Sequence, residues 1–175
     1  YDADQQHGTS YYKNFIEFMK KVQSEDLALV CAQTDVKGNR VWRPGKQKDP
    51  DLYLRVVEKR PDGIIVNGAK AHNSCSAYAD EIVVLPTRNM AADEVDWAVA
   101  FSVPADAEGI SLINGAFNPP RRQRLKAPYN LQGESHSMTI FDHVFVPWER
   151  VFLCGETEQA GKAALLFALY HRHSY

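Results

Sequence analysis

Cysteine is scarce in this sequence, and its few copies lie far apart. Cys31, Cys75 and Cys154 are odd in number and form no CxxC pair. A zinc ribbon needs closely spaced pairs of ligands, and a small disulfide scaffold needs an even and denser set of cysteines. We therefore expect neither of these, and three separate thiols favour a reducing, cytoplasmic environment.

Long apolar segments are missing too. The longest uninterrupted one covers residues 163–170, whereas a helix that crosses a bilayer needs about 20 apolar residues. Residues 1–7 have neither the basic start nor the apolar centre of a secretory signal. The sequence therefore predicts a protein that makes no contact with a membrane.

A surplus of basic charge is also absent, because 20 Lys and Arg residues face 22 Asp and Glu residues and the net charge is −2. Domains that bind nucleic acid usually carry a basic surplus. Arg121, Arg122 and Arg124 form a local cluster, which is the ordinary pattern of a solvated loop. We expect no nucleic-acid partner.

What the sequence does contain is the composition of a globular protein. It has 175 residues, of which 45% are hydrophobic and 24% are charged, and this length suits a single core. The chain does not begin with Met, and its last predicted helix has no stop signal. We therefore expect a piece of a larger soluble enzyme.

Two segments have helical periodicity. Residues 9–25 begin with Thr9 or Ser10 as the cap, and residues 156–175 repeat small and aromatic side chains at helical intervals. The apolar stripe of the first segment is typical of core packing. Its members are Tyr11, Tyr12, Phe15, Ile16, Met19 and Val22.

The region between these helices predicts a series of short strands. β-favouring residues and turn signals alternate there without an intervening helix, which favours an antiparallel barrel or sandwich. The predicted fold class is therefore mainly β with flanking helices. Residues 116–132 are rich in Pro, Arg and Asn and predict a long loop. The expected strands are 27–34, 52–59, 64–70, 81–85, 97–103, 110–114 and 138–146.

Two polar segments come at the ends of predicted strands. We call residues 33–40 the first polar segment and residues 72–74 the second polar segment. Polar side chains at the end of a strand can contact a ligand, but the same residue types also dominate ordinary turns. Local sequence leaves both readings open. The candidate ligand-binding residues are Gln33, Thr34, Arg40, His72, Asn73 and Ser74.

Histidines form a third group of candidates. His171 and Tyr175 are four residues apart on a predicted helix, so they share one face. Histidine can ligate a metal or transfer protons, and tyrosine can donate a proton beside it; a packed or solvated histidine is the ordinary alternative. His136 and His143 flank the last predicted strand without the spacing of metal ligands, so a zinc site built with Cys154 has little support.

Several ordered motifs resemble a single family of enzymes. Together they resemble the 4-hydroxyphenylacetate 3-hydroxylase family, and most closely its 4-hydroxybutyryl-CoA dehydratase branch. The likeness covers nearly the whole chain apart from residues 116–132. The motifs are QTDVKGNR at 33–40, DLYLRVVEK at 51–59, GAKAH at 68–72, FDHVFVP at 141–147, FLCG at 152–155 and YHRHSY at 170–175.

The resemblance implies a fold similar to that of acyl-CoA dehydrogenases. Residues 1–25 would then end an N-terminal helical domain, and residues 26–155 would form a middle β-barrel domain. Residues 156–175 would begin a C-terminal helical domain. The family binds FAD between barrel and helical bundle, and the resemblance implies a homotetramer for the full-length protein.

The same resemblance implies FAD contacts for both polar segments. Gln33, Thr34 and Arg40 match the first flavin-contacting segment, and the second comprises His72, Asn73 and Ser74. Polar groups at strand ends can hydrogen-bond the edge of the flavin ring and tune its electronics. We therefore expect FAD as the cofactor.

The dehydratase branch also carries a [4Fe-4S] cluster held by three cysteines and one histidine. By resemblance, His171 matches the cluster ligand and Tyr175 a catalytic tyrosine. None of the three cysteines of this chain matches a cluster position. We therefore expect the cluster only in the full-length protein, and we expect the 175-residue chain to be inactive alone.

Some positions depart from the dehydratase pattern. His136 stands where a catalytic Glu is expected, and Gln33 and Ser74 replace Met and Thr. Serine keeps the hydroxyl, but imidazole titrates near neutral pH whereas an unperturbed carboxylate is ionised there. We expect Tyr175 and His136 in proton transfer, with His171 completing the catalytic set.

These expectations leave three hypotheses about function. The leading one is an FAD-dependent lyase or isomerase that acts on a short acyl-CoA by dehydration or double-bond isomerisation. The alternative is an aromatic hydroxylase that uses FADH₂ and O₂ on a small aromatic substrate, without a cluster. The third is a non-catalytic binding or assembly module. Flavin titration tests it, and the titration must include the full-length protein, because a flavoprotein that lacks half its site would also fail to bind flavin.

Overall fold

The computed structural model describes residues 1–115 and 136–171 of the chain. The predicted loop at 116–132, with its three arginines, lies outside the described residues, as does Tyr175. Among the described residues, no helix combines the length and the apolar character that a membrane span requires.

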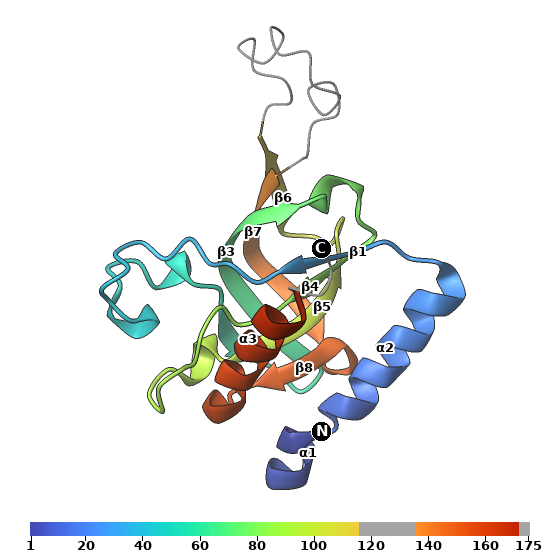
Figure 1. The fold of residues 1–175 in the computed structure, drawn as a ribbon, viewed down its shortest axis with the longest axis horizontal. Helices are drawn as coiled ribbons and strands as arrows, with labels where there is room; N and C mark the ends of the chain where they lie inside the picture. Colours follow the sequence, from blue (N-terminus) through green and yellow to red (C-terminus); the bar gives the residue numbers. More distant parts are fainter. Residues whose placement is uncertain (116–135, 172–175) are drawn as a thin grey trace, which may run out of the picture.

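Within the described residues the strands form two four-stranded sheets (Figure 1). The first sheet contains, in spatial order, β1 (Leu29–Ala32), β4 (Glu81–Val84), β5 (Val99–Pro104) and β8 (Val151–Cys154). The second sheet contains β2 (Arg55–Lys59), β3 (Gly63–Ser74), β7 (His136–Pro147) and β6 (Ile110–Asn114). Strands β1 and β4 run parallel, and the other paired strands run antiparallel.

The hydrophobic core lies between the two sheets. Because side chains alternate along a strand, each sheet directs every second residue inward. Phe101 of β5 and Phe141 of β7 meet edge to face across this interface, with ring centroids 6.0 Å apart. The prediction of a mainly β fold with flanking helices is thus confirmed, in its sandwich form. Other core residues are Val56, Ile64, Val66, Ile82, Val84, Val99, Val103, Val144, Val146 and Val151.

The strand limits differ from the predicted ones where local turns intervene. Strand β6 matches the prediction, but β2 begins only at Arg55. The reason is a 3₁₀ turn before it, where the Asp49 carboxylate accepts a hydrogen bond from the Asp51 backbone N at 3.0 Å. Strand β8 was not predicted, because four residues directly after a turn carry no clear period. In the described part of the chain, the 3₁₀ turns are Pro44–Lys46, Pro50–Leu52, Ser76–Tyr78, Val95–Trp97 and Trp148–Arg150.

Three helices flank the sandwich in the described residues. They are α1 (Asp2–His7), α2 (Tyr11–Glu25) and α3 (Thr157–His171). Figure 1 shows α3 in front of the first sheet. Ala160 of α3 packs there with Ala98, Ala100 and Leu153.

Ser10 occupies the N-cap position of α2, as one of the two predicted alternatives, but the capping hydrogen bonds come from another residue. Neither Thr9 nor Ser10 caps the helix with its side chain. The carboxylate of Asp4 does so instead, accepting hydrogen bonds from the backbone N of Tyr11 at 2.9 Å and of Tyr12 at 2.8 Å. The sequence could not predict this cap, because α1 is too short to have a helical pattern.

The predicted apolar stripe of α2 is only partly right. Phe18 and Val22 are the buried residues of α2, whereas Tyr12 is 49% and Phe15 is 41% exposed. The helix packs against β8, where the rings of Phe18 and Phe152 lie 5.6 Å apart. The buried face therefore lies to one side of the stripe that the periodicity indicated.

Candidate functional site

The two polar segments lie side by side, although 36 residues separate Thr34 from Ala71, the residue with which its backbone pairs. Asp35 forms an isolated antiparallel bridge with Lys70, and the backbone N of Ala71 donates to the Thr34 carbonyl at 2.7 Å. The end of β1 is thereby attached to the end of β3. The sequence predicted two polar strand ends, and the structure brings them together.

A buried ion pair holds this junction. The Lys70 ammonium lies 2.8 Å from an Asp35 carboxylate oxygen, and both side chains are 2% exposed. Lys70 Nζ also donates to the carbonyl oxygens of Gln33 at 3.0 Å and Leu85 at 2.9 Å. Burial raises the pKa of Asp35, and the Lys70 ammonium opposes that rise. Sequence reasoning missed Lys70 because a single lysine in an apolar strand resembles an exposed edge residue.

A β-bulge turns the second polar segment outward. Lys70 pairs with Thr139 and Asn73 with Ser137, so β3 has one residue more than β7 over this stretch. His72 lies in the bulge with φ 59°, in the left-handed region that non-glycine residues seldom adopt. Bulges of this kind often lie beside active sites, where they redirect a side chain. Here the bulge leaves the His72 side chain exposed.

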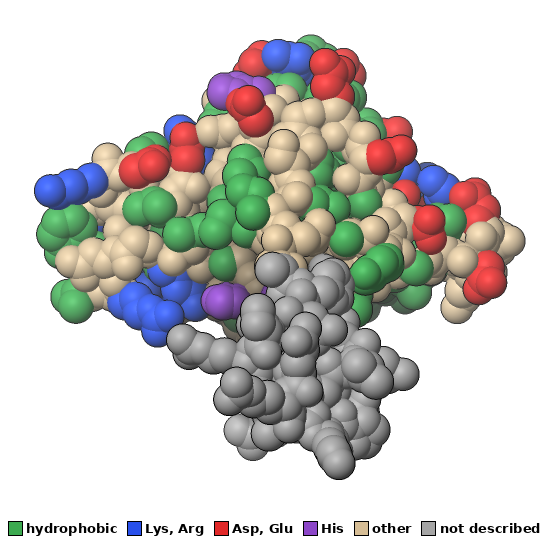
Figure 2. All heavy atoms as spheres, turned by 90° about the horizontal axis from the view of Figure 1, so that it is seen from above, with side chains coloured by type: hydrophobic (Ala, Val, Ile, Leu, Met, Phe, Trp, Pro, Cys, Tyr) green, Lys and Arg blue, Asp and Glu red, His purple; other side chains and the backbone are tan. Residues whose placement is uncertain are grey.

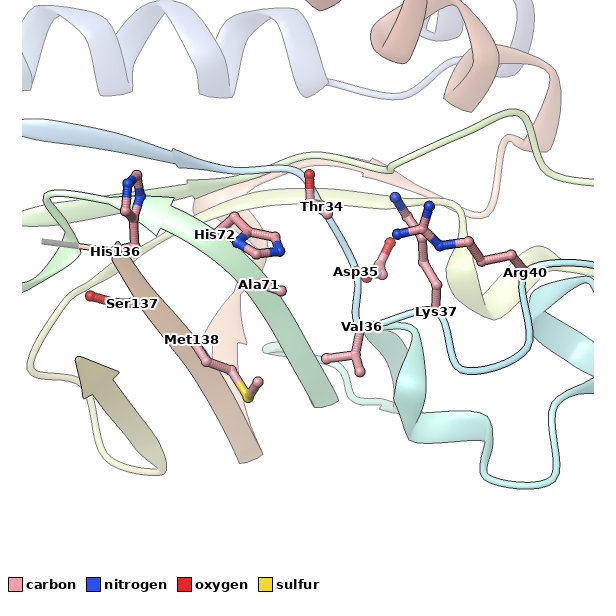
Figure 3. Close-up of a pocket in the computed structure, with 10 residues that line it drawn as sticks. All are labelled: Thr34, Asp35, Val36, Lys37, Arg40, Ala71, His72, His136, Ser137 and Met138. Carbon is pink, nitrogen blue, oxygen red and sulfur yellow. The ribbon is translucent and has the colours of Figure 1, made fainter. Parts of the chain in front are cut away.

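A central pocket of about 360 Å³ lies between the polar segments. In Figure 3 His72 extends from β3 toward Thr34 and Asp35, and Arg40 approaches from the opposite side. The pocket brings together three residues predicted to contact a cofactor, Thr34, Arg40 and His72, and the predicted catalytic residue His136. Its full lining is Thr34, Asp35, Val36, Lys37, Arg40, Ala71, His72, His136, Ser137 and Met138.

A neighbouring pocket of about 540 Å³, which we call the β1 pocket, contains the remaining predicted contacts. It shares Thr34, Ala71 and His72 with the central pocket. Phe167 of α3 also lines it, so this helix borders the same region. The predicted cofactor contacts that line the β1 pocket are Gln33, Thr34, His72, Asn73 and Ser74.

The side chains of Asn73 and Ser74 make different contacts. Asn73 is 2% exposed, and its Oδ1 accepts a hydrogen bond of 3.1 Å from Thr139 Oγ1, which fixes the bulge from inside. Ser74 is exposed, and its Oγ shares a hydrogen bond of 3.0 Å with His136 Nδ1 on the paired position of β7. The side chains of Ser74 and His136 are thus joined by a hydrogen bond between β3 and β7.

The remaining candidates are less defined. His171 ends α3, but its side chain lies outside the described residues, as does Tyr175. His143 lies on β7, where its Nδ1 is 2.7 Å from Asp142, and it lines neither pocket. Within residues 1–115 and 136–170, no three His, Cys, Asp or Glu side chains are grouped for metal binding. The roles of His171 and Tyr175 stay predictions.

The described sandwich is found again in the acyl-CoA dehydrogenase from Geobacillus kaustophilus, with a TM-score of 0.56 at 22% identity over 97% of this chain and 39% of that one. This likeness concerns the fold alone. Residues 1–153 match the family described as 4-hydroxyphenylacetate 3-hydroxylase N terminal. The chain therefore belongs to the 4-hydroxyphenylacetate 3-hydroxylase family, and the resemblance of its motifs is confirmed.

Relatives within the family are enzymes of two kinds. The chain is 44% identical to the 4-hydroxybutyryl-CoA dehydratase/vinylacetyl-CoA-Δ-isomerase of Clostridium aminobutyricum, over 100% of this chain and 37% of the relative. The solved archaeal 4-hydroxybutyryl-CoA dehydratase from N. maritimus is 38% identical, with a TM-score of 0.91 over 99% of this chain and 36% of that one. The oxygenase component of 4-hydroxyphenylacetate 3-monooxygenase, solved in complex with FAD, is 30% identical. Its TM-score is 0.76, over 90% of this chain and 32% of that one. The chain thus spans about a third of the length of these relatives.

Proposed function

We propose that this chain is the flavin-binding β domain of an enzyme that dehydrates a short acyl-CoA or isomerises its double bond. The observation that carries the proposal is the junction of the two polar segments at one pocket. The identity of 44% to a dehydratase, against 30% to a solved monooxygenase, favours the acyl-CoA reaction. The solved monooxygenase is an FAD complex, which supports FAD as the cofactor.

The residues of the central pocket fit a flavin. The side chains of Thr34, His72 and Arg40 make no hydrogen bond within the described part of the chain, so they are available to a ligand. Val36 and Met138 supply apolar surface beside them. A flavin ring combines an apolar face with a polar edge, and it supplies electron transfer when bound. Thr34 and His72 would bind the ring edge, and Arg40 would contribute positive charge.

Proton transfer falls to His136 in this proposal. The Ser74 hydroxyl holds the imidazole ring of His136 through its Nδ1 atom. We assign proton exchange with the substrate to the Nε2 atom of the same imidazole. Imidazole suits this role because its charge changes near neutral pH. His171 and Tyr175 would contribute a [4Fe-4S] ligand and a second proton donor in the full-length gene product. That product would be a cytoplasmic homotetramer, and the 175-residue chain alone would be inactive.

The direct test is the purified full-length gene product. We expect it to bind FAD, to contain iron and acid-labile sulfide, and to dehydrate 4-hydroxybutyryl-CoA. A His136→Gln variant should keep FAD but lose most of the activity, because glutamine cannot exchange a proton near neutral pH. A protein that binds FAD but leaves the thioester unchanged would overturn the acyl-CoA assignment.

The second candidate is an aromatic hydroxylase that uses reduced flavin and O₂. It is favoured by the similarity to the oxygenase component of 4-hydroxyphenylacetate 3-monooxygenase. The discriminating experiment supplies the full-length gene product with FADH₂, O₂ and 4-hydroxyphenylacetate. Formation of a catechol by an iron-free protein would support this candidate against the first.

A further inference from the structure

A third pocket borders the first polar segment through Lys37 and Arg40. This cationic pocket has a volume of about 370 Å³ and shares Lys37 and Arg40 with the central pocket. We propose that it binds the diphosphate group of a nucleotide ligand. The proposal rests on the proposed function, because it assumes that a flavin or a CoA thioester binds next to it. The lining residues are Lys37, Arg40, Tyr53, Thr87, Arg88 and Asn89.

The topology explains why these cations meet. Strands β1 and β4 are neighbours and run parallel, so the loops that follow them leave the sheet at the same edge. Lys37 and Arg40 belong to the loop after β1, and Arg88 belongs to the loop after β4. An antiparallel pairing would have placed these loops at opposite edges.

Hydrogen bonds hold both loops in place. Lys70 Nζ reaches the carbonyl of Gln33 after β1 and that of Leu85 after β4, at 3.0 and 2.9 Å. On the far side, Arg43 Nη2 donates to the Asn89 carbonyl at 3.2 Å. Arg43 is itself fixed by an ion pair with the buried Glu94. The walls of the pocket are therefore fixed before a ligand arrives.

The charges of the pocket are unbalanced. Lys37, Arg40 and Arg88 form no ion pair with any described residue. In Figure 3 the side-chain nitrogens of Lys37 and Arg40 lie close together, and Figure 2 shows Lys and Arg side chains gathered on the side where the β1–β2 loop lies. Like charges that share a pocket repel one another, and a bound anion would remove that cost.

An uncharged donor adds to this arrangement. Tyr53 lines the pocket and is only 2% exposed, yet its hydroxyl makes no hydrogen bond with the described residues. Among the described residues the buried side-chain polar atom without a partner is Ser102 Oγ, so the Tyr53 hydroxyl itself reaches the pocket surface, where a ligand can meet it. Thr87 also lines the pocket and contributes a second hydroxyl. Guanidinium groups and hydroxyls are the usual donors to phosphate oxygens.

FAD and CoA both contain a diphosphate, so the shared chemistry does not distinguish them. Because the two pockets share a wall, a flavin whose ring occupies the central pocket could extend its diphosphate into the cationic pocket. A CoA thioester could enter from the cationic pocket and direct its acyl group to the central one. The experiment below has one arm for each source.

The test uses the flavin-free full-length gene product, with Arg88→Gln as the main variant and Lys48→Gln as the matched control. Lys48 is an exposed cation of the β1–β2 loop that does not line the cationic pocket. Isothermal titration gives the Kd for inorganic pyrophosphate, FAD, riboflavin and CoA. Riboflavin is informative because it carries the flavin ring without phosphate. Arg88→Lys, which keeps the charge, serves as a second variant.

We expect Arg88→Gln to weaken pyrophosphate binding about tenfold or more, as for loss of a charge-assisted hydrogen bond. Arg88→Lys should weaken it less, and Lys48→Gln should not change it. An equal loss for FAD with riboflavin unchanged assigns the diphosphate to the flavin, and a loss for CoA alone assigns it to the thioester. Unchanged affinity of Arg88→Gln for pyrophosphate, FAD and CoA overturns the proposal. If the proposed function alone fails, the wild-type protein binds no flavin but its pyrophosphate affinity still depends on Arg88.

Discussion

The ammonium nitrogen of Lys70 lies 2.8 Å from a carboxylate oxygen of Asp35, and both side chains are 2% exposed. This pair joins β3 to the segment that follows β1. The central pocket and the cationic pocket both have walls built on that segment. The ion pair therefore holds in place the segment that forms walls of the candidate site.

Removing one partner of this pair should be costly. Lys70→Met leaves the Asp35 carboxylate buried without its counter-ion, and we expect a loss of about 3–5 kcal/mol in the free energy of unfolding. The double variant Lys70→Met with Asp35→Leu removes both charges and should recover much of that loss. Urea unfolding of the wild-type chain and the variants measures this. If Lys70→Met lowers the free energy of unfolding by less than about 1 kcal/mol, the ion pair does not stabilise the junction of the two polar segments.

Glu94 should make the stability depend on pH in the acid range. Burial alone would raise the pKa of Glu94, but hydrogen bonds from Arg43 and from the Ala91 backbone outweigh it and hold the pKa below its ordinary value of 4.5. A lowered pKa stabilises the fold above the unfolded value, and this contribution disappears as the pH falls through the folded pKa.

The variant Glu94→Gln should therefore lose about 1–3 kcal/mol of unfolding free energy at neutral pH. At an acid pH below the folded pKa, where the carboxylate is protonated in both states, the difference should shrink. Urea unfolding at the two pH values provides the comparison. A difference that stays constant or grows toward low pH would contradict the assigned ion pair.

Gly68 should be sensitive to the smallest substitution. It lies at a register shift between β3 and β7 with φ 131°, and an added Cβ would lie 2.7 Å from the Leu54 Cα. Gly68→Ala should cost about 2–5 kcal/mol, since backbone strain and overpacking add. Gly8→Ala is the control, because φ is 68° there but nothing lies within 4 Å of the added Cβ. It should cost about 1 kcal/mol. Equal losses in thermal unfolding would contradict the close approach at Gly68.

The three cysteines should react at different rates. Burial raises the pKa of the Cys31 thiol to about 11 and also raises that of the buried Cys154, whereas Cys75 is exposed. Because the thiolate is the reactive form, iodoacetamide at neutral pH should label Cys75 first. The half-buried Cys31 should react more slowly than Cys75, and the buried Cys154 should react only after unfolding. Peptide mass spectrometry measures the order, and early labelling of Cys31 would contradict its burial.

The sequence predicted much of the fold because its signals are local. Strand β6 lies where alternation and turns placed it, and the helical periods of α2 and α3 are real. The cap that Asp4 provides was missed, because it depends on a contact with α1. The buried face of α2 was predicted only partly correctly, because it depends on the packing of the helix against β8. The parallel pairing of β1 with β4 has no local signal at all.

For the candidate site too, the sequence predicted what local signals determine and missed what depends on contacts between distant segments. Polar strand ends such as Thr34 and His72 could be selected from sequence, since turn residues stand out against apolar strands. Their contact could not, because it depends on the Lys70 ion pair and on the bulge at His72. The sequence motifs indicated the family, and FAD was expected because the family binds it.

The central claim is that the junction of the polar segments binds FAD, and one titration tests it most directly. His72 and His143 both adopt positive φ, at 59° and 52°, and only His72 lines the central pocket. Asparagine tolerates this backbone conformation, so His72→Asn and His143→Asn are matched variants. FAD titration of the flavin-free full-length gene product should give wild-type affinity for His143→Asn and an affinity about tenfold weaker for His72→Asn. Equal affinities for the two variants, or no FAD binding by the wild-type protein, would contradict the claim.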